Sequence, residues 1–162
     1  MKKIVATALF VVFFPAWAFA HGTAEPPPAA PERTAAIEDA GRTVDAFHDA
    51  LTKGDRQAAQ ALLDDKVQIF EQGWVERSKA EYAAHHLESD AAFSAATTSA
   101  QTARSGMILG ELAYVTSEGK VSGTFKGKFI DSITLETMVL RRAPDGWRIV
   151  HIHWSSRDAK KK

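Results

Sequence analysis

The stretch GWRIVHIHWSS, residues 146–156, decides the fold because its polar and apolar side chains alternate. A period of two is typical of a β-strand, whose successive side chains point to opposite faces of a sheet. One face is apolar and the other carries two imidazoles and a hydroxyl: Val150, Ile152 and Trp154 against His151, His153 and Ser155. Such a polar row is typical of a pocket wall, so we expect this face of the strand to line a pocket.

The residues before this stretch extend the same pattern. Residues 144–146, Pro-Asp-Gly, are typical of a tight turn. Residues 130–142 therefore predict a long strand that pairs with residues 148–155 across that turn. Residues 66–72 alternate in the same way and predict an early strand.

Further strands are predicted in the middle of the chain. Residues 112–117 predict a strand, and residues 97–104 a weaker one, because alanine and serine dilute the pattern there. Gly119, Gly123 and Gly127 predict a loop region before the long strand.

The first half of the chain carries helical signals. Apolar residues recur at spacings of 3, 4, 3 and 4 from Ile37 to Leu51, which predicts an amphipathic helix. Asp55 predicts the N-cap of a short second helix. The sequence SKAE from Ser78 fits a capping box and predicts a third helix through about Ser89. Together the elements predict an α+β fold, in which three N-terminal helices and a cone-shaped, curved antiparallel sheet enclose a pocket.

The N-terminus is typical of a secretory signal. Two lysines precede the uncharged apolar residues 4–14, and Ala-Phe-Ala at 18–20 fits a cleavage site. We expect a signal peptide of residues 1–20, cleaved after Ala20, because the apolar segment is shorter than the about 20 residues that a membrane span needs. Export to the periplasm follows, with no membrane attachment after cleavage. Residues 21–33 predict a Pro/Ala-rich linker, whose first residue, His21, offers copper an imidazole beside the new amino terminus.

Composition limits the classes of partner. The chain has 162 residues and no cysteine, so an exported form has no disulfide and depends on its core or on oligomerisation. Removal of the two lysines of the signal changes the formal charge from 20 − 20 = 0 to 18 − 20 = −2. No basic surplus indicates nucleic-acid binding. A single domain is expected over residues 34–157, followed by a basic tail, 158–162.

Residues 34–157 resemble the nuclear transport factor 2-like superfamily, the helical half in the order and length of its elements. They are most similar to bacterial SnoaL-like proteins and to the association domain of calcium/calmodulin-dependent kinase II. The resemblance rests on ETMVLRR at 136–142, the Asp-Gly turn, WRIVHIHWS at 147–155 and GELAYV at 110–115. It implies a cone with a pocket and a homodimer formed through the sheets. It does not imply one activity, because the fold hosts isomerases, cyclases, dehydratases and assembly modules.

The imidazoles of His151 and His153 are the first candidate site residues. Side chains two residues apart on a strand leave the same face, so the pair can offer two nitrogen ligands to one metal. The same pair can line a polar pocket or act in acid–base chemistry. No cofactor is predicted, and copper or zinc stays an open alternative in which His85 or His86 joins the pair.

Three residues of the predicted third helix are further candidates. His85 and His86 lie about 100° apart on a helix and cannot face one point equally well. His86 can meet Asp90 at i,i+4, where the carboxylate would orient the imidazole. Tyr82 lies one turn earlier and offers a phenol to the pocket.

Glu136 lies between Thr134 and Met138 on its strand face. If it lines the pocket, burial would raise its pKa and make it a candidate base; the alternative is pairing with a basic side chain such as Arg148. Glu71 could reach the same pocket mouth. His48 lies beside the apolar stripe of the first helix and is expected at the surface or rim.

These candidates support four functions. The first is a periplasmic homodimer that holds a small polar or anionic molecule through His151, His153, Glu136, His86 and Tyr82. The second is a metal-free acid–base enzyme of the isomerase, dehydratase or cyclase type, with His151 or Glu136 as the base. The third is a transition-metal binder, and the fourth is an oligomerisation module.

Overall fold

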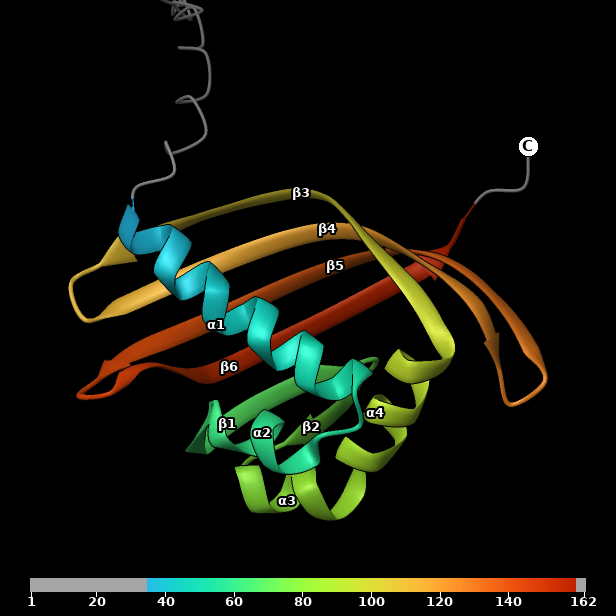
Figure 1. Cartoon of the computed structure of the whole chain (residues 1–162), viewed down its shortest axis with the longest axis horizontal. Coiled ribbons are helices and arrows are strands. Elements are labelled where there is room, and N and C mark those ends of the chain that lie inside the picture. Colours follow the sequence, from blue (N-terminus) through green and yellow to red (C-terminus); the bar gives the residue numbers. More distant parts are fainter. Residues whose placement is uncertain (1–34, 160–162) are drawn as a thin grey trace, which may run out of the picture.

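The computed structural model describes residues 35–159. The predicted signal peptide and linker and residues 160–162 of the tail lie outside this part. Four helices and six strands follow one another, and the first helix crosses the sheet (Figure 1). They are α1 (Ala35–Thr52), α2 (Arg56–Ala61), β1 (Leu63–Glu71), β2 (Trp74–Glu76), α3 (Lys79–His85), α4 (Leu87–Ala96), β3 (Thr97–Leu109), β4 (Leu112–Phe125), β5 (Lys128–Ala143) and β6 (Gly146–Asp158). None of the helices in the described part is long and apolar enough to span a membrane.

The six strands form one curved sheet in the order β2-β1-β6-β5-β4-β3. The helices lie on its concave side, with α2, α3 and α4 gathered near β1 and β2 (Figure 1). The predicted α+β architecture is confirmed. One pair departs from the antiparallel expectation, because β1 and β6 run parallel. These strands are distant in sequence, so no hairpin turn fixes their relative direction.

The core lies between α1 and the inner face of the sheet. The predicted stripe of α1 is buried, with Val44 and Phe47 at 0% exposure. It packs against apolar side chains that share one face of the strands. The buried strand residues of this core are Leu63, Val67, Ile69, Ala113, Val115, Met138, Leu140, Trp147, Ile149 and Ile152.

The predicted third helix is in fact two helices. His86 ends α3 and precedes α4, with φ −103° and ψ −30°. Ser78 caps α3 as predicted, since its side chain accepts a hydrogen bond from the Glu81 amide. The break lets the chain change direction, so α4 runs on to Ala96 and reaches the open end of the cone (Figure 1).

The predicted glycine loop is wrong, because β4 continues through it to Phe125. Only Gly127 lies in a turn: Lys126 (φ 48°) and Gly127 (φ 76°) form a two-residue hairpin connection. A Cβ on Gly123 would lie 2.9 Å from the Ala96 carbonyl oxygen, so this glycine permits close approach of the α4 end. Gln72 and Gly73 form a similar turn, which adds the short strand β2 that the sequence pattern did not predict.

The last strand contains a bulge that shifts the expected faces. Val139 pairs with His151 and Leu140 pairs with Ile149, so Val150 has no partner on β5. The bulge changes the phase of alternation. Ile149 and Ile152 are therefore both fully buried. The prediction that Val150 lies on the packed face is wrong, because its side chain is only partly buried.

Candidate functional site

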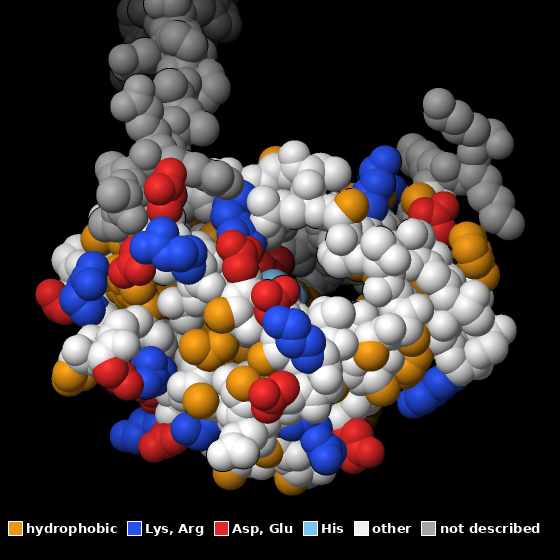
Figure 2. Space-filling model, in the orientation of Figure 1, with side chains coloured by type: hydrophobic (Ala, Val, Ile, Leu, Met, Phe, Trp, Pro, Cys, Tyr) orange, Lys and Arg blue, Asp and Glu red, His pale blue; other side chains and the backbone are white. Residues whose placement is uncertain are grey.

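A cavity of about 750 Å³ lies between the helices and the sheet at the open end of the cone. It is bordered by α1, α4, β3, β4, β5, β6 and the end of β1. The space-filling view shows the molecule hollowed on this side, with acidic side chains close to the opening (Figure 2). This cavity is the candidate functional site.

The lining is polar and acidic. Hydroxyl groups come from all sides of the cavity, and its charged residues are six acids, one arginine and one histidine. The hydroxyl residues are Thr52, Ser94, Thr97, Thr98, Ser99, Ser117, Ser132, Thr134, Ser155 and Ser156. The charged residues are Asp45, Asp49, Glu71, Asp90, Glu118, Glu136, Arg104 and His48.

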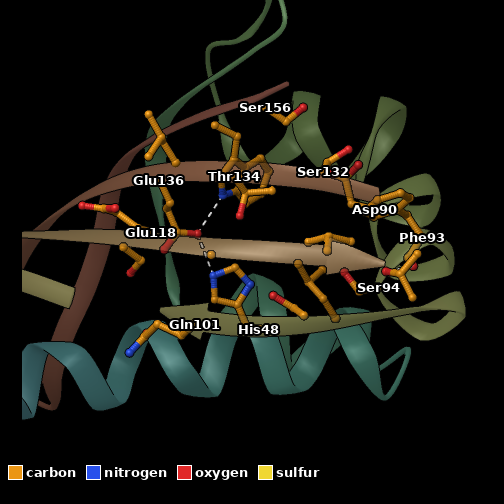
Figure 3. Close-up of a pocket in the computed structure, with 18 of the residues that line it drawn as sticks. His48, Asp90, Phe93, Ser94, Gln101, Glu118, Ser132, Thr134, Glu136 and Ser156 are labelled. Atoms are coloured by element: carbon orange, nitrogen blue, oxygen red, sulfur yellow. Dashed lines mark hydrogen bonds and ion pairs between the residues drawn. The ribbon is translucent and has the colours of Figure 1, made fainter. Parts of the chain in front are cut away.

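A histidine–glutamate pair forms the wall near the middle of the cavity. Oε2 of Glu136 lies 2.6 Å from Nε2 of His48 and accepts a second hydrogen bond from Nε1 of Trp154 at 2.7 Å (Figure 3). Glu136 and Trp154 are directly paired on β5 and β6, whereas His48 reaches them from α1. Glu136 is only 9% exposed, and its Oε1 is buried without a partner among the described residues.

The two partners favour each other's charged form. Burial disfavours ionised Glu136, but the hydrogen bonds and charge of His48, with help from Trp154, outweigh it and lower the pKa of Glu136 below its usual range. Burial likewise opposes the charge of His48, but the bond to Glu136 and its charge raise the pKa of His48 above its usual value. The arrangement therefore favours the imidazolium–carboxylate form of the pair.

The imidazole of His48 remains open to the cavity. Its Nε2 faces Glu136, and its Nδ1 forms no hydrogen bond with a described residue. The side chain of His48 is 43% exposed and forms part of the cavity lining. This ring can donate or accept a proton at a bound molecule.

A second ion pair borders the same wall. Nη2 of Arg104 lies 2.6 Å from Oδ1 of Asp45, and Nε of Arg104 donates to Oγ of Ser117 at 3.4 Å. The arginine side chain is 12% exposed, and its charge is offset by Asp45. The cavity therefore keeps an excess of negative charge.

Two further carboxyl groups line the opposite end of the cavity. Asp90 accepts a 2.8 Å hydrogen bond from the hydroxyl of the fully buried Tyr82. Burial raises the pKa of Asp90 despite this bond. Burial and the nearby charge of Asp90 raise the pKa of Glu71 to about 7, while His86 opposes the shift. The pKa of Tyr82 is raised, first by burial and then by Asp90, so the phenol stays protonated.

The structure places the predicted His151 and His153 away from the cavity. Neither lines it, and both lie on the face of the sheet opposite the helices. Their rings contact Phe70 of β1, with centroids 5.0 Å and 6.3 Å apart. The expectation that they form the pocket wall is wrong, because Ile152 and Trp154 of the same strand occupy its inner face.

The predicted union of these histidines with His85 or His86 is also absent. Within residues 35–159, neither His151 nor His153 belongs to a group of three potential ligands. His85 and His86 instead both approach the carboxylate of Glu76, His85 Nδ1 at 3.3 Å. In a continuous helix the side chains of His85 and His86 would point about 100° apart. Because the helix breaks at His86, both side chains can reach Glu76.

The outcome for the remaining candidates is mixed. Glu136 lines the cavity, and its basic partner is His48, since Arg148 pairs with Asp145 at 2.5 Å. Tyr82 lies behind Asp90 and does not line the cavity. The sequence predicts His48 at the surface or rim; its position one residue after the buried Phe47, at the edge of the apolar stripe, is the signal that could have identified it.

Comparison with known families finds one that matches most of the chain. The family described as "SnoaL-like domain" matches residues 41–158. A comparison with the curated proteins finds no match.

Solved structures with the same architecture include proteins of several kinds. A candidate ketosteroid isomerase from Shewanella frigidimarina is 43% identical, with a TM-score of 0.69 over 72% of this chain and 94% of that one. A candidate dehydratase of the nuclear transport factor 2-like family from Streptomyces avermitilis is 24% identical, with a TM-score of 0.63 over 76% and 98%. A candidate calcium/calmodulin-dependent kinase II association domain from Xanthomonas campestris is 19% identical, with a TM-score of 0.65 over 80% and 91%. The two less similar structures bear on the fold alone.

Proposed function

We propose that this chain, which belongs to the SnoaL-like family of the nuclear transport factor 2-like superfamily, binds a small polar molecule in its cavity. The observation that carries the proposal is the His48–Glu136 pair at the cavity wall. A charged pair is costly to desolvate, and here one member keeps an accessible imidazole. That imidazole is the group that contacts the bound molecule.

The charge of the lining favours a neutral or cationic ligand that carries hydroxyl or amino groups. Six acidic residues line the cavity against one arginine, which Asp45 already neutralises. A negative potential lowers the local concentration of anions and raises that of cations. Ten hydroxyl residues supply donors and acceptors for a polyol or an amine. The anionic alternative is the weaker one.

A thermal-shift screen with neutral sugars and polyols, amines and carboxylates tests this proposal. A hit is then measured by isothermal titration against His48→Gln and Glu136→Gln. We expect each variant to weaken binding by about tenfold or more, because a charge-assisted contact of about 1.5–3 kcal/mol is lost. His153→Ala, on the opposite face, is the matched control. Binding by carboxylates alone, or equal binding by all variants, would contradict the proposal.

Proton-transfer catalysis is the second candidate function. One observation favours it: the cavity holds an imidazole whose pKa is raised by Glu136, His48, and a carboxyl with a pKa of about 7, Glu71. A carboxyl with a raised pKa can act as a general acid or base near neutral pH, and the imidazole of His48 lies in the same cavity. The 43% identical protein named as a candidate ketosteroid isomerase has the same fold. Turnover of ketones and hydroxy-ketones that His48→Gln and Glu71→Gln each abolish would establish it; no turnover above the double variant would exclude it for these substrates.

Assembly and location complete the proposal. We infer export to the periplasm with cleavage after Ala20, which N-terminal sequencing of the protein from a bacterial periplasm tests. The homodimer would use the sheet face opposite the helices, where Phe70, Met107, Leu109 and Leu112 are exposed. Light scattering separates a dimer from a larger ring, and a ring would favour the assembly function instead.

A further inference from the structure

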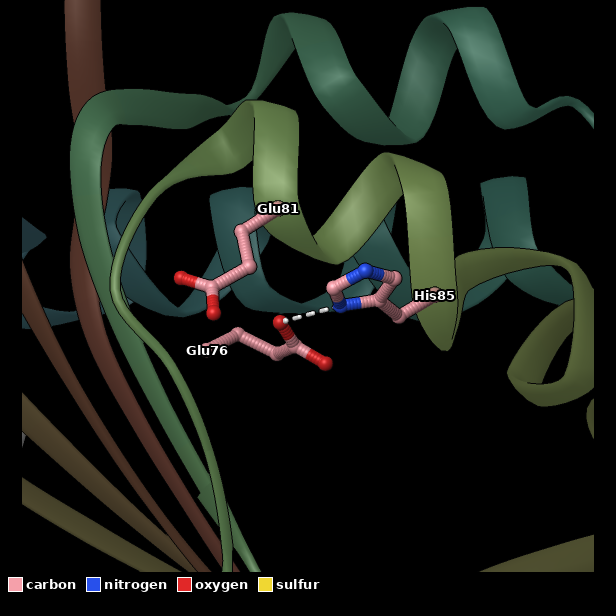
Figure 4. Close-up of side chains that lie close together, drawn as sticks. All are labelled: Glu76, Glu81 and His85. Atoms are coloured by element: carbon pink, nitrogen blue, oxygen red, sulfur yellow. Dashed lines mark hydrogen bonds and ion pairs between the residues drawn. The ribbon is translucent and has the colours of Figure 1, made fainter.

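We propose that Glu76, Glu81 and His85 bind a divalent transition-metal cation such as Zn²⁺, outside the cavity. The potential ligand atoms of these three side chains lie within 4.8 Å of one another. Glu76 ends β2, and the other two face it from one side of α3 at i and i+4 (Figure 4). None of the three lines the cavity, so the site is independent of the proposed function.

Glu76 is the fixed member of the group. It is one of two buried charged residues in the described core, and it is 4% exposed. Its Oε2 lies 3.3 Å from Nδ1 of His85, and its Oε1 contacts Nδ1 of His86. A buried carboxylate needs a positive charge close to it, and its side-chain contacts among the described residues are the imidazoles of His85 and His86. A cation at this position would supply that charge.

Glu81 and His85 keep ligand atoms available to solvent. Oε2 of Glu81 accepts a hydrogen bond at 2.7 Å from the amide of Arg77, the residue before the N-cap, and Oγ of Ser78 accepts one from the Glu81 amide. Its Oε1 forms no hydrogen bond with a described residue. The His85 side chain is 59% exposed. A cation can therefore enter from solvent and meet a carboxylate oxygen that the helix cap holds in place.

Surrounding charges favour a cation as well. The charge of Glu76 acts on Asp90 and Tyr82, and His86 lies within range of Glu71 and Asp90. The nearby Lys79 is held 2.5 Å from Asp65 and does not neutralise this group. Among the described residues, no lysine or arginine forms an ion pair with Glu76 or Glu81.

The ligand set suits zinc. Zinc binds histidine nitrogen and carboxylate oxygen at about 2.0–2.2 Å, which places neighbouring ligand atoms of a tetrahedral site about 3.4 Å apart. The exposed His85 and the partly exposed Glu81 can close the remaining gap by side-chain rotation. His86, bonded to the other oxygen of Glu76, orients that carboxylate, as partners behind metal ligands do.

Isothermal titration of the cleaved, untagged protein with ZnCl₂ at pH 7.5 tests the site. We expect one zinc per chain, and affinity reduced by about tenfold or more in His85→Ala and in Glu81→Gln. Gln can accept the same hydrogen bond from the Arg77 amide, so Glu81→Gln separates metal binding from folding. The controls are His153→Ala, an exposed histidine on the far sheet face, and His21→Ala, which removes the imidazole beside the amino terminus.

X-ray absorption of the zinc-loaded protein gives a second reading. One imidazole with oxygen ligands supports the site. No zinc binding, equal binding by both variants and the wild type, loss of binding in His153→Ala or His21→Ala, or a shell of three or more imidazoles would overturn it.

Discussion

Two glutamates in one cavity have opposite electrostatic roles at the scale of single residues. Glu136 is more deeply buried, yet its pKa is lowered, because His48 and Trp154 both donate to it. Glu71 has no such donor among the described residues, and burial beside Asp90 raises its pKa to about 7. Hydrogen-bond partners, rather than depth, decide which of the two carries a charge at neutral pH.

The His48–Glu136 pair should stabilise the fold most strongly between about pH 4.5 and 6.5, the ordinary values of its members. The raised pKa of His48 gives stability that is complete below 6.5 and is lost as pH rises through the folded value. The lowered pKa of Glu136 gives stability that is complete above 4.5 and is lost as pH falls. Urea unfolding of the wild type and of the double variant His48→Gln/Glu136→Gln from pH 3 to 9 should differ most inside this window. A pH-independent difference would show that the pair is uncharged.

Glu71→Gln should stabilise the protein at alkaline pH. The pKa of Glu71 is about 7 in the folded protein, against an ordinary value of 4.5 in the unfolded chain. The folded protein therefore loses stability as pH rises from 4.5 to about 7. The neutral amide avoids this loss. We expect a higher Tm than the wild type at pH 8 and an equal Tm at pH 4. Asp49→Asn, an exposed acid paired with Lys53, is the control and should change little at either pH.

At the scale of elements, the position of α1 depends on a glycine in β3. A Cβ on Gly106 would lie 2.4 Å from the Tyr114 carbonyl oxygen and 2.8 Å from Cδ1 of Ile37. A backbone carbonyl cannot move aside as a flexible side chain can. Because Gly106 has no Cβ, the start of α1 can approach the sheet at this point. The resulting contact closes the core at the end away from the cavity.

Gly106→Ala and Gly41→Ala should therefore change stability in opposite directions. We expect Gly106→Ala to destabilise by about 1–3 kcal/mol through overpacking. Gly41 lies inside α1, and its Cβ would meet only Nη1 of Arg104 at 3.6 Å, an ordinary contact. Gly41→Ala should stabilise by up to about 1 kcal/mol through helix propensity. Chemical denaturation measures both; a neutral Gly106→Ala would mean that α1 shifts freely on the sheet.

The sequence predicted elements correctly where a periodic pattern extends over many residues. It failed where a change in backbone conformation involves only one or two residues. The stripe of α1 and the cap of α3 were correct because each depends on neighbours in sequence. The break at His86, the two-residue turn at Lys126 and the bulge at Val150 each involve one or two residues. A bulge leaves no periodic signal, yet it decides which residues of β6 face the core.

At the scale of the whole molecule, the sheet separates two kinds of surface. Its inner face forms the core and the cavity, and its outer face carries the histidines of β6 and exposed apolar groups. Phe70, beside His151 and His153, is 37% exposed, and Met107 is 38% exposed. Such a face is suited to burial against a second copy.

Phe70→Asp should convert the proposed dimer to a monomer in light scattering, because a charge would be buried at the interface. Phe129→Asp is the matched control: Phe129 is 77% exposed but lies near the β4–β5 turn. The control should leave the mass unchanged. A wild-type monomer would contradict the proposed dimer. A dimer in both variants would place the interface elsewhere.

The sequence by itself determined the α+β class, the superfamily, the first helix and the long C-terminal strands, since each depends on local periodicity or a contiguous motif. Only the tertiary structure decided that His48 is the partner of Glu136, because 88 residues separate them and helix packing brings them together. It also shows that His151 and His153 lie on the outer face of the sheet and not in the cavity. Alternation shows that two side chains share a face of a strand, but which face lies inward depends on the helices and strands that pack against it.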